Sequence, residues 1–299
     1  MIEKYLNDEF FSRLETYSLM LRRDLSGFFG GKHLVNTYGQ TVEFADYREY
    51  MLGDDIRRID WNLYGRFEKF FLKLFTDERQ MHTQIFLDCS ASMGKVNQQK
   101  AAYAMAFAAA LGYLSVHNMD KVSYRLIHGD KAEDPYGLIV GKTPFFRAVS
   151  TFGDIRFEDD AFLEDAILNS GDTSEKNGLS VIISDFFTEN SWKKAVDYLC
   201  YKKRQVLLVQ VMSPEERDPT YSGRVNLVDS EAPDLLDERN MKLRITRSMQ
   251  DTYQEALNDY IADIKAFCAS RQVNFISVTT DQPVEKVIFK ELLNTGILE

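Results

Sequence analysis

The amino-acid sequence predicts an α/β protein with a doubly wound, mainly parallel sheet. From about Gln84 onward, short apolar runs typical of strands alternate with helical patterns, as they do in β-α-β units. Crossovers between such units are right-handed and place helices on both faces of the sheet. A chain of 299 residues is also long enough to bury a substantial core.

The expected strands are apolar runs bounded by polar residues or turn signals: Thr83 to Leu87, Lys121 to Ile127, Leu179 to Ser184, Gln205 to Met212 and Val273 to Val278. The segments expected to form helices are Gln98 to His117, Pro144 to Phe152, Ala161 to Asn169, Ser191 to Tyr201, Met249 to Ser270 and Val284 to Asn294. The apolar run from Ala101 to Val116 is alanine-rich and shorter than the roughly 20 residues that span a membrane. It predicts a helix buried against the sheet.

A β-hairpin insertion is expected near residues 213–247. The turn-rich connector Ser213 to Pro219 follows the fourth strand run. Two segments, Arg224 to Ser230 and Lys242 to Thr246, have the composition of short strands and are separated by an acidic loop. We expect them to form a hairpin that extends the edge of the sheet.

The N-terminal part of the chain differs in composition from the rest. Asp8 to Phe29 is predicted to be helical, with Gly30-Gly31 as its stop signal. The residues that follow are rich in charged and aromatic side chains and lead into the first strand without a flexible linker. We therefore expect residues 1–82 to form an extension that packs on a core domain of residues 83–299, with Trp61 as a packing anchor.

Composition and charge narrow the classes of function. Acidic residues (46) exceed basic residues (36), so the net charge is −10 and the surface is expected to repel nucleic acid and anionic membranes. The charged N-terminus does not have the pattern of a signal peptide. Three widely spaced cysteines and four histidines without ligand spacing predict neither a zinc site nor a disulfide framework. These features predict a cytoplasmic protein that is not inserted in a membrane.

A motif of hard oxygen donors follows the first expected strand. The strand run ends in Asp88, and Ser90 and Ser92 follow at alternate positions. A second carboxylate, Asp185, comes directly after another apolar strand run. Because open α/β sheets bind ligands outside the carboxyl ends of their strands, we expect these four residues to converge there, with Asp88 beside solvent. Carboxylate and hydroxyl oxygens suit Mg²⁺, which is therefore the expected ion.

Other interpretations of the motif are open. Asp88, Ser90 and Ser92 are residue types that cap helices, although the second carboxylate favours a metal site. Gly94-Lys95 resembles the end of a phosphate-binding loop, but Val96 stands where that loop requires Ser or Thr. Asp88 also resembles the nucleophile of haloacid-dehalogenase-like phosphatases, but Ser90 replaces the second aspartate of that motif.

The spacing Asp88-x-Ser90-x-Ser92 resembles the metal-ion-dependent adhesion site of von Willebrand factor A-type domains. This resemblance implies a Rossmann-type fold in which the serines bind Mg²⁺ directly and the aspartates hold it largely through water. It further implies that an acidic residue of a partner protein fills the open position on the metal.

The chain departs from the adhesion-site pattern at one ligand. Domains of this type also use a threonine, expected just before Leu163, but residues 157–162 contain none. Asp159 or Asp160 could replace it, or Thr143 or Thr151 could reach the site from further away. If none does so, the metal site is degenerate.

The segment before the motif resembles the family catalogued as domain of unknown function 58. The matching residues are Glu43-Phe44, Tyr47-Arg48, Tyr50, Gly53-Asp54-Asp55, Arg57, Ile59-Asp60-Trp61, Gly65-Arg66, Lys73 and Glu78-Arg79. Members of this family carry the segment immediately before an adhesion-site-like strand, as this chain does. The resemblance implies a working relationship with a MoxR-type AAA+ ATPase.

These features lead us to expect a bacterial, cytoplasmic protein–protein interaction module. It is expected to bind partners through a Mg²⁺-dependent site and to work with a MoxR-type AAA+ ATPase, and it is not expected to be an enzyme. One alternative is a Mg²⁺-dependent hydrolase that uses Asp88, for which the sequence shows no general base. The other is a scaffold whose metal site is degenerate.

Overall fold

The computed structural model describes residues 6–15, 42–51, 54–77, 81–94, 97–158, 160–170, 178–188, 191–221, 223–227 and 241–294. These residues belong to two compact units. The larger unit, the sheet domain, contains residues 6–15 and the described residues from 81 onward. The smaller unit, the hairpin unit, contains the described residues between 42 and 77.

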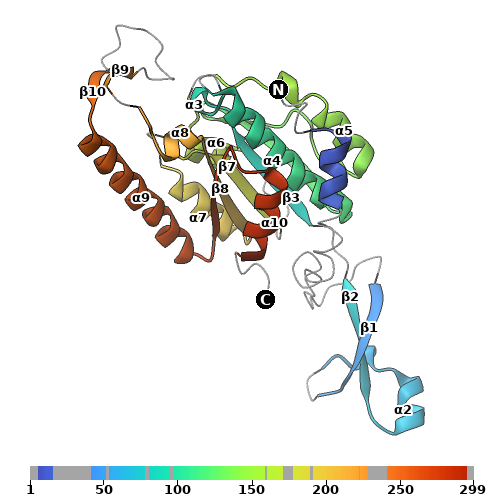
Figure 1. The fold of residues 1–299 in the computed structure, drawn as a ribbon. Coiled ribbons are helices and arrows are strands. Elements are labelled where there is room, and N and C mark those ends of the chain that lie inside the picture. The colour runs from blue at the N-terminus through green and yellow to red at the C-terminus, as the bar shows by residue number, and fades with distance from the viewer. Residues whose placement is uncertain are drawn as a thin grey trace. The chain divides into compact units, whose positions relative to one another are not determined.

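A seven-stranded, mainly parallel sheet forms the centre of the sheet domain (Figure 1). Its parallel strands are β3 (His82–Asp88), β4 (Lys121–His128), β7 (Gly178–Ser184), β8 (Gln205–Met212) and β11 (Asn274–Thr279). Each lies where the sequence predicted it, which confirms the mainly parallel α/β sheet. Two short strands that were not predicted pair antiparallel with β4: β5 (Lys131–Glu133) and β6 (Ile139–Val140).

The order of the strands defines where a ligand site can form. The parallel strands are arranged β4-β3-β7-β8-β11, which in chain order is 2-1-3-4-5, a common order of doubly wound sheets. From β3 the chain first builds toward β4 and then returns to add β7 on the other side of β3. Ligands of open α/β sheets bind in the crevice at such a switch point. The register places Leu87 opposite Ile183, so β3 and β7 end at the same level.

Helices cover both faces of the sheet, as the sequence predicted (Figure 1). They are α4 (Gln98–His117), α5 (Lys142–Val149), α6 (Leu163–Asn169), α7 (Lys193–Tyr201), α9 (Arg247–Ala269) and α10 (Val284–Asn294). Alternate residues of β3 pack with different helices: Ile85 and Leu87 share a hydrophobic cluster with α4, α5 and α10, whereas Phe86 packs with α6, α7 and α9. The two clusters therefore lie on opposite faces. Three shorter helices complete the domain: α3 (Ala91–Gly94), η3 (Phe152–Asp154) and α8 (Pro214–Arg217).

Helix α4 is the buried helix that its alanine-rich sequence predicts. All of its residues from Lys100 to Val116 are buried, which the small side chains allow because they let the helix approach the sheet closely. Among the helices of the described ranges, none has the length and apolar character needed to cross a membrane.

The N-terminal helix belongs to the sheet domain. It covers residues 8–15, and Phe10, Phe11 and Leu14 are buried in the same cluster as α4 and α5. This segment is the beginning of the helix predicted from Asp8 to Phe29. The remainder of that prediction lies outside the described residues.

The predicted hairpin forms, but it does not extend the central sheet. Strands β9 (Gly223–Leu227) and β10 (Met241–Ile245) pair antiparallel with each other. In the part of the chain that the structure describes, they make a two-stranded sheet of their own. The prediction that the hairpin extends the sheet was wrong: β9 and β10 pair with each other, and β11 is the strand that pairs with β8.

The hairpin unit contains an antiparallel strand pair with a short helix. Its elements are β1 (Val42–Glu49), η2 (Ile56–Arg58), α2 (Trp61–Phe67) and β2 (Phe71–Asp77). The carboxylate of Asp60 caps α2 by accepting hydrogen bonds from the backbone N–H groups of Asn62 and Leu63. That residues 1–82 pack on the sheet domain stays a prediction.

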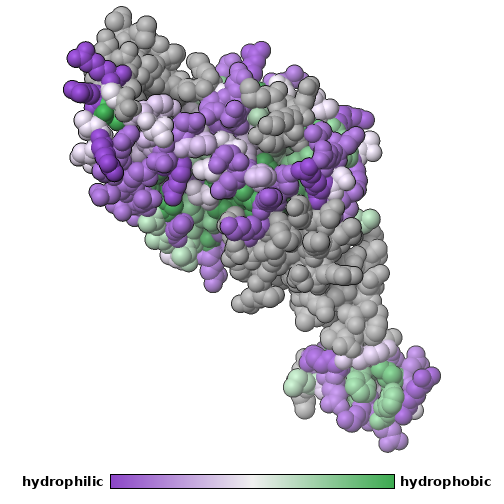
Figure 2. All heavy atoms as spheres, in the orientation of Figure 1, coloured by the Kyte–Doolittle hydropathy of each residue, from purple (hydrophilic) through white to green (hydrophobic). Residues whose placement is uncertain are grey.

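Trp61 does not anchor the packing within the hairpin unit, since 63% of its surface is exposed. Its ring meets Tyr64 and Phe70 edge-on at 6.2 and 6.3 Å, and those two rings stack at 4.6 Å. Within the described part of the hairpin unit, one short helix on a two-stranded sheet is too small to enclose these rings. Figure 2 shows hydrophobic residues at the surface of this unit.

We predict that Gly112→Ala destabilises the sheet domain, although alanine favours helices. A Cβ atom at position 112 would lie 1.9 Å from the hydroxyl of Tyr124, which is fully buried on β4. We expect the free energy of unfolding to fall by about 2 kcal/mol in urea denaturation, because overpacking outweighs the helix propensity of about 1 kcal/mol. Gly65→Ala in α2, where a Cβ atom meets open space, is the matched control and is expected not to lower stability. A stabilised Gly112→Ala variant would contradict the packing described for α4.

Candidate functional site

The structure brings the four predicted site residues together at the switch point of the sheet. Asp88 is the last residue of β3, and Asp185 follows the last residue of the neighbouring strand β7. Ser90 and Ser92 lie on the loop and short helix that follow Asp88. We refer to Asp88, Ser90, Ser92 and Asp185 as the strand-end site. That these residues bind a metal stays a prediction.

The sequence predicted that Asp88 lies beside solvent, but the structure shows that it is buried. Only 3% of its surface is exposed. Its carboxylate accepts a hydrogen bond from the hydroxyl of Ser184 at 2.5 Å and another from the backbone N–H of Ser90 at 2.9 Å. Burial, followed by repulsion from Asp185, raises the pKa of Asp88 to about 6.

A chain of hydrogen bonds joins the other three residues. The hydroxyl groups of Ser90 and Ser92 lie 3.1 Å apart, and that of Ser92 donates to Oδ2 of Asp185 at 2.9 Å. Oδ1 of Asp185 accepts from the backbone N–H of Phe187 at 3.0 Å. The loops after β3 and β7 are therefore connected through side chains of the strand-end site.

Lys100 adds a positive charge that the sequence analysis did not assign to the site. Its side chain is fully buried, and Nζ lies 2.7 Å from Oδ2 of Asp185 and 2.8 Å from Oε1 of Glu216. Burial alone would lower the pKa of Lys100, but the two carboxylates raise it above its ordinary value, so the ammonium stays protonated. Lys100 thereby ties α4 to the end of β7 and to α8.

Glu216 is held in place by the turn after β8. Ser213 and Glu216 form a capping box at the start of α8: the Ser213 hydroxyl accepts from the Glu216 N–H, and Oε2 of Glu216 accepts from the Ser213 N–H at 2.7 Å. The Tyr253 hydroxyl, from α9, donates to the Glu216 backbone carbonyl at 2.7 Å. The second carboxylate around Lys100 is therefore fixed by contacts to two further elements.

The turn after β7 is held in an unfavourable backbone conformation. Phe186 has φ of 61°, in the left-handed region that a bulky side chain rarely adopts. Its N–H donates to the hydroxyl of Ser184, its carbonyl accepts from the Tyr260 hydroxyl, and its ring packs 5.4 Å from that of Trp192. These contacts hold the turn that directs Asp185 toward Lys100, and such strain is concentrated at functional sites.

The segment before Leu163, where the sequence analysis expected a third ligand, contacts the loop after β3. The backbone N–H of Glu158 donates to the carbonyl of Cys89 at 3.0 Å. Of the candidates to replace the missing threonine, Thr151 donates to the Ala148 carbonyl within its own turn, and Thr143 is exposed on α5. Asp160 is half-buried, and Asp159 lies outside the described residues.

The strand-end site gathers hard oxygen donors. The Ser90–Ser92 and Ser92–Asp185 oxygen distances of 3.1 and 2.9 Å are those of ordinary hydrogen bonds. Carboxylate and hydroxyl oxygens are the donor types that Mg²⁺ prefers. Within the described residues, no cluster of three or more His, Cys, Asp or Glu side chains competes as a metal site. The donor set of two carboxylates and two hydroxyls therefore fits a hard cation.

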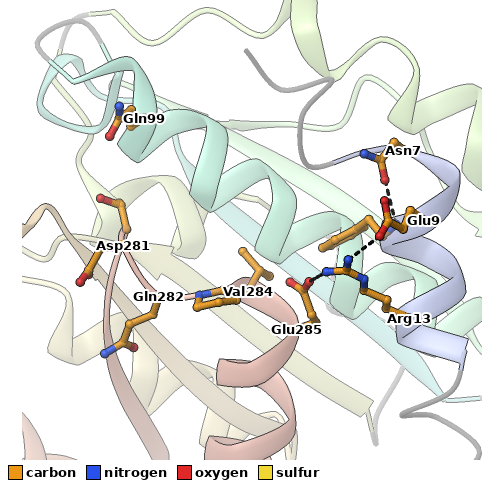
Figure 3. Close-up of a pocket in the computed structure, with 11 residues that line it drawn as sticks. Asn7, Glu9, Arg13, Gln99, Asp281, Gln282, Val284 and Glu285 are labelled. Carbon is orange, nitrogen blue, oxygen red and sulfur yellow. Dashed lines mark hydrogen bonds and ion pairs between the residues drawn. The ribbon is translucent and has the colours of Figure 1, made fainter.

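A separate cavity of about 510 Å³ lies between the N-terminal helix and the start of α10 (Figure 3). It is lined by polar residues such as Gln99, Asp281 and Gln282, and on one side Arg13 pairs with Glu285 at 3.2 Å. None of the four strand-end residues lines it. The cavity is therefore distinct from the site that the sequence predicted.

One sequence signal could have identified Lys100. It is the third residue of α4, and the positive end of the helix dipole disfavours a cation in the first turn of a helix. A lysine there, directly before a long apolar run, indicates a carboxylate partner from another segment. Glu216 gives no such signal, because its capping box with Ser213 explains it locally.

We predict that Asp88 makes stability depend on pH between about 4 and 6. The pKa of Asp88 is about 6 in the folded protein against an ordinary value of 3.8, so in this window the folded protein keeps a proton that the unfolded chain releases. The free energy of unfolding therefore falls as pH rises, by on the order of 3 kcal/mol for this group.

Asp88→Asn tests this pH dependence, because the amide keeps the shape of the carboxyl and does not titrate. We expect urea unfolding with a chelator present to show a smaller decrease in stability from pH 4 to 7 in Asp88→Asn than in the wild type. An identical pH profile in the two proteins would mean that Asp88 is ionised throughout.

Curated mycobacterial proteins are similar to this chain in sequence. The uncharacterized proteins Rv1480 of Mycobacterium tuberculosis and Mb1516 of Mycobacterium bovis are each 24% identical to this chain over 282 residues, which cover 90% of this chain and 84% of theirs.

Two solved structures from Bacteroides are similar. The conserved hypothetical protein BatB of Bacteroides thetaiotaomicron aligns with a TM-score of 0.43 at 16% identity, over 72% of this chain and 98% of that one. An aerotolerance-related membrane protein of Bacteroides fragilis aligns with a TM-score of 0.41 at 16% identity, over 71% of this chain and 98% of that one.

The family described as "Protein of unknown function DUF58" matches residues 46–259. Since this match covers most of the chain, the protein belongs to that family.

Proposed function

We propose that this protein is a protein–protein interaction module of the von Willebrand factor A type, and that it binds its partner at the strand-end site. The observation that carries the proposal is the hydrogen-bonded series of Ser90, Ser92 and Asp185 beside Asp88 at the switch point of the sheet. This is the position at which open α/β sheets bind ligands. Ser92 is partly exposed, so a partner can reach the site from solvent.

In this proposal Mg²⁺ would be held directly by the hydroxyl groups of Ser90 and Ser92 and, largely through water, by the carboxylates of Asp88 and Asp185, as the adhesion-site resemblance implies. The ion would supply a positive charge to which an acidic side chain of the partner binds. The residues of this chain orient their oxygens through the hydrogen bonds described above, and Ser184 holds Asp88 in place. Because the two loops are linked, loss of one hydroxyl is expected to disturb the whole site.

The proposed partner is a MoxR-type AAA+ ATPase, which follows from the resemblance of the N-terminal segment rather than from the geometry. We propose a cytoplasmic location because the three widely spaced cysteines favour a reducing compartment. The net charge of −10 makes nucleic acid or an anionic membrane an unsuitable partner. A partner that presents an acidic residue to the site and surrounds it with basic residues would suit the charge of this chain.

The geometry does not favour a hydrolase that uses Asp88. Both oxygens of that carboxylate already accept hydrogen bonds from Ser184 and Ser90, and 3% exposure leaves little room for a substrate. A nucleophile needs an accessible oxygen and a base within hydrogen-bond reach. An assay of phosphatase activity with the purified protein directly distinguishes a hydrolase from an interaction module.

We predict that Ser92→Ala weakens binding of the MoxR-type ATPase from the same organism by about tenfold or more, as expected for a residue at the centre of an interface. The change removes the hydroxyl that links Ser90 to Asp185 but leaves the buried pair of Lys100 intact. Binding is measured with purified proteins in a pull-down followed by a quantitative titration, and circular dichroism checks the fold.

Ser150→Ala is the matched control, since the hydroxyl of that exposed serine donates to the carbonyl of Arg147 within its own helix end. The ATPase itself needs Mg²⁺ to bind nucleotide, so the comparison of variants is more informative than a chelator alone. Equal binding by Ser92→Ala and Ser150→Ala would show that the partner does not use the strand-end site.

A further inference from the structure

We infer that Lys100 is a built-in cation of the strand-end site, which competes with Mg²⁺ for Asp185 and sets the affinity of the site for the metal. This inference rests on the proposed function, because it assumes that Mg²⁺ binds there. It goes beyond that proposal by assigning the control of metal affinity to a residue outside the Asp-x-Ser-x-Ser motif.

The first support is that one oxygen atom of Asp185 accepts hydrogen bonds from two groups. Oδ2 of Asp185 accepts from the hydroxyl of Ser92 at 2.9 Å and from Nζ of Lys100 at 2.7 Å. Ser92 is one of the proposed Mg²⁺ ligands, so this oxygen faces the position that the metal would take. The ammonium therefore neutralises the carboxylate on which the metal depends.

The second support is that moving the Lys100 side chain out of the site is unfavourable. Its side chain has no exposed surface, and a buried ammonium without a partner costs several kcal/mol. The residues that follow Lys100 on α4, from Ala101 to Val116, are buried as well. The positive charge is therefore a permanent part of the site.

The third support is that Lys100 has a second carboxylate partner, Glu216. Glu216 binds the same ammonium at 2.8 Å, and its own position is fixed by the capping box with Ser213. When Asp185 turns toward a metal, Lys100 keeps Glu216 as a partner. The structure therefore permits Mg²⁺ to bind with Lys100 in place, but against repulsion between two neighbouring positive charges.

The inference predicts how two kinds of substitution at Lys100 change Mg²⁺ binding. Removing the charge of Lys100 strengthens Mg²⁺ binding, and keeping the charge in Lys100→Arg does not. A lysine with a purely structural role would show the reverse order, because Lys100→Met would disturb the site and weaken metal binding.

The test is isothermal titration calorimetry of the full-length protein with MgCl₂ at constant ionic strength. We expect Lys100→Met to bind Mg²⁺ with a dissociation constant about tenfold or more below that of the wild type. Lys194→Met removes the same charge from an exposed pair with Glu164 and is the matched control, expected to leave the affinity unchanged. Thermal unfolding with and without MgCl₂ provides a second readout, in which Lys100→Met gains more stability from the ion.

A second variant covers the case in which Lys100→Met does not fold without metal. The double variant Lys100→Met with Glu216→Gln removes a positive and a negative charge together, and the glutamine keeps an oxygen for the Ser213 N–H. We expect it to bind Mg²⁺ more tightly than the wild type. Equal or weaker Mg²⁺ binding by both variants would overturn the inference while leaving the proposed metal site intact. If neither the wild type nor any variant binds Mg²⁺, the proposed metal site fails and the inference fails with it.

Discussion

The buried ion pairs of Lys100 are the interactions on which the strand-end site depends. One ammonium joins α4 to the end of β7 through Asp185 and to α8 through Glu216. Burying a charge is costly unless it is paired, so in the absence of a bound cation both carboxylates stay near Lys100. The position of Asp185 fixes Ser92 and, through it, the loop after β3. The same contacts that stabilise this end of the sheet thus determine which oxygens face the switch point.

The order of the strands is the second constraint. Because β3 and β7 are parallel neighbours, the residues at their carboxyl ends meet although they are far apart in the sequence. Ser184 then connects the two loops, since its hydroxyl donates to Asp88 and accepts from the N–H of Phe186. The left-handed conformation of Phe186 is the local cost of turning Asp185 toward Lys100, and it is offset by the burial of the Phe186 ring.

Much of the sheet domain could be predicted from the sequence, whereas the electrostatics of the site could not. Apolar runs such as 205–212 and the alanine-rich helix α4 are defined by local periodicity, and the structure confirms them. The convergence of Asp88 and Asp185 followed from the rule that parallel strands end at one edge of the sheet. The partnership of Lys100 with Glu216 joins segments separated by 116 positions and is visible only in three dimensions. The exposure of Trp61 was missed because the small size of its unit is a property of tertiary structure.

The most direct test of the account is a double-mutant cycle between Lys100 and Asp185, measured as free energies of unfolding in urea without divalent ions. The cycle compares Lys100→Met, Asp185→Asn and the double variant with the wild type. The account predicts a coupling energy of about 2 kcal/mol or more, because Lys100→Met leaves the buried Asp185 carboxylate without the ammonium and Asp185→Asn leaves Lys100 with Glu216 alone, whereas the double change removes both charges of the pair. A coupling energy within about 0.5 kcal/mol of zero would show that the two residues act independently and would contradict the central role given to their ion pair.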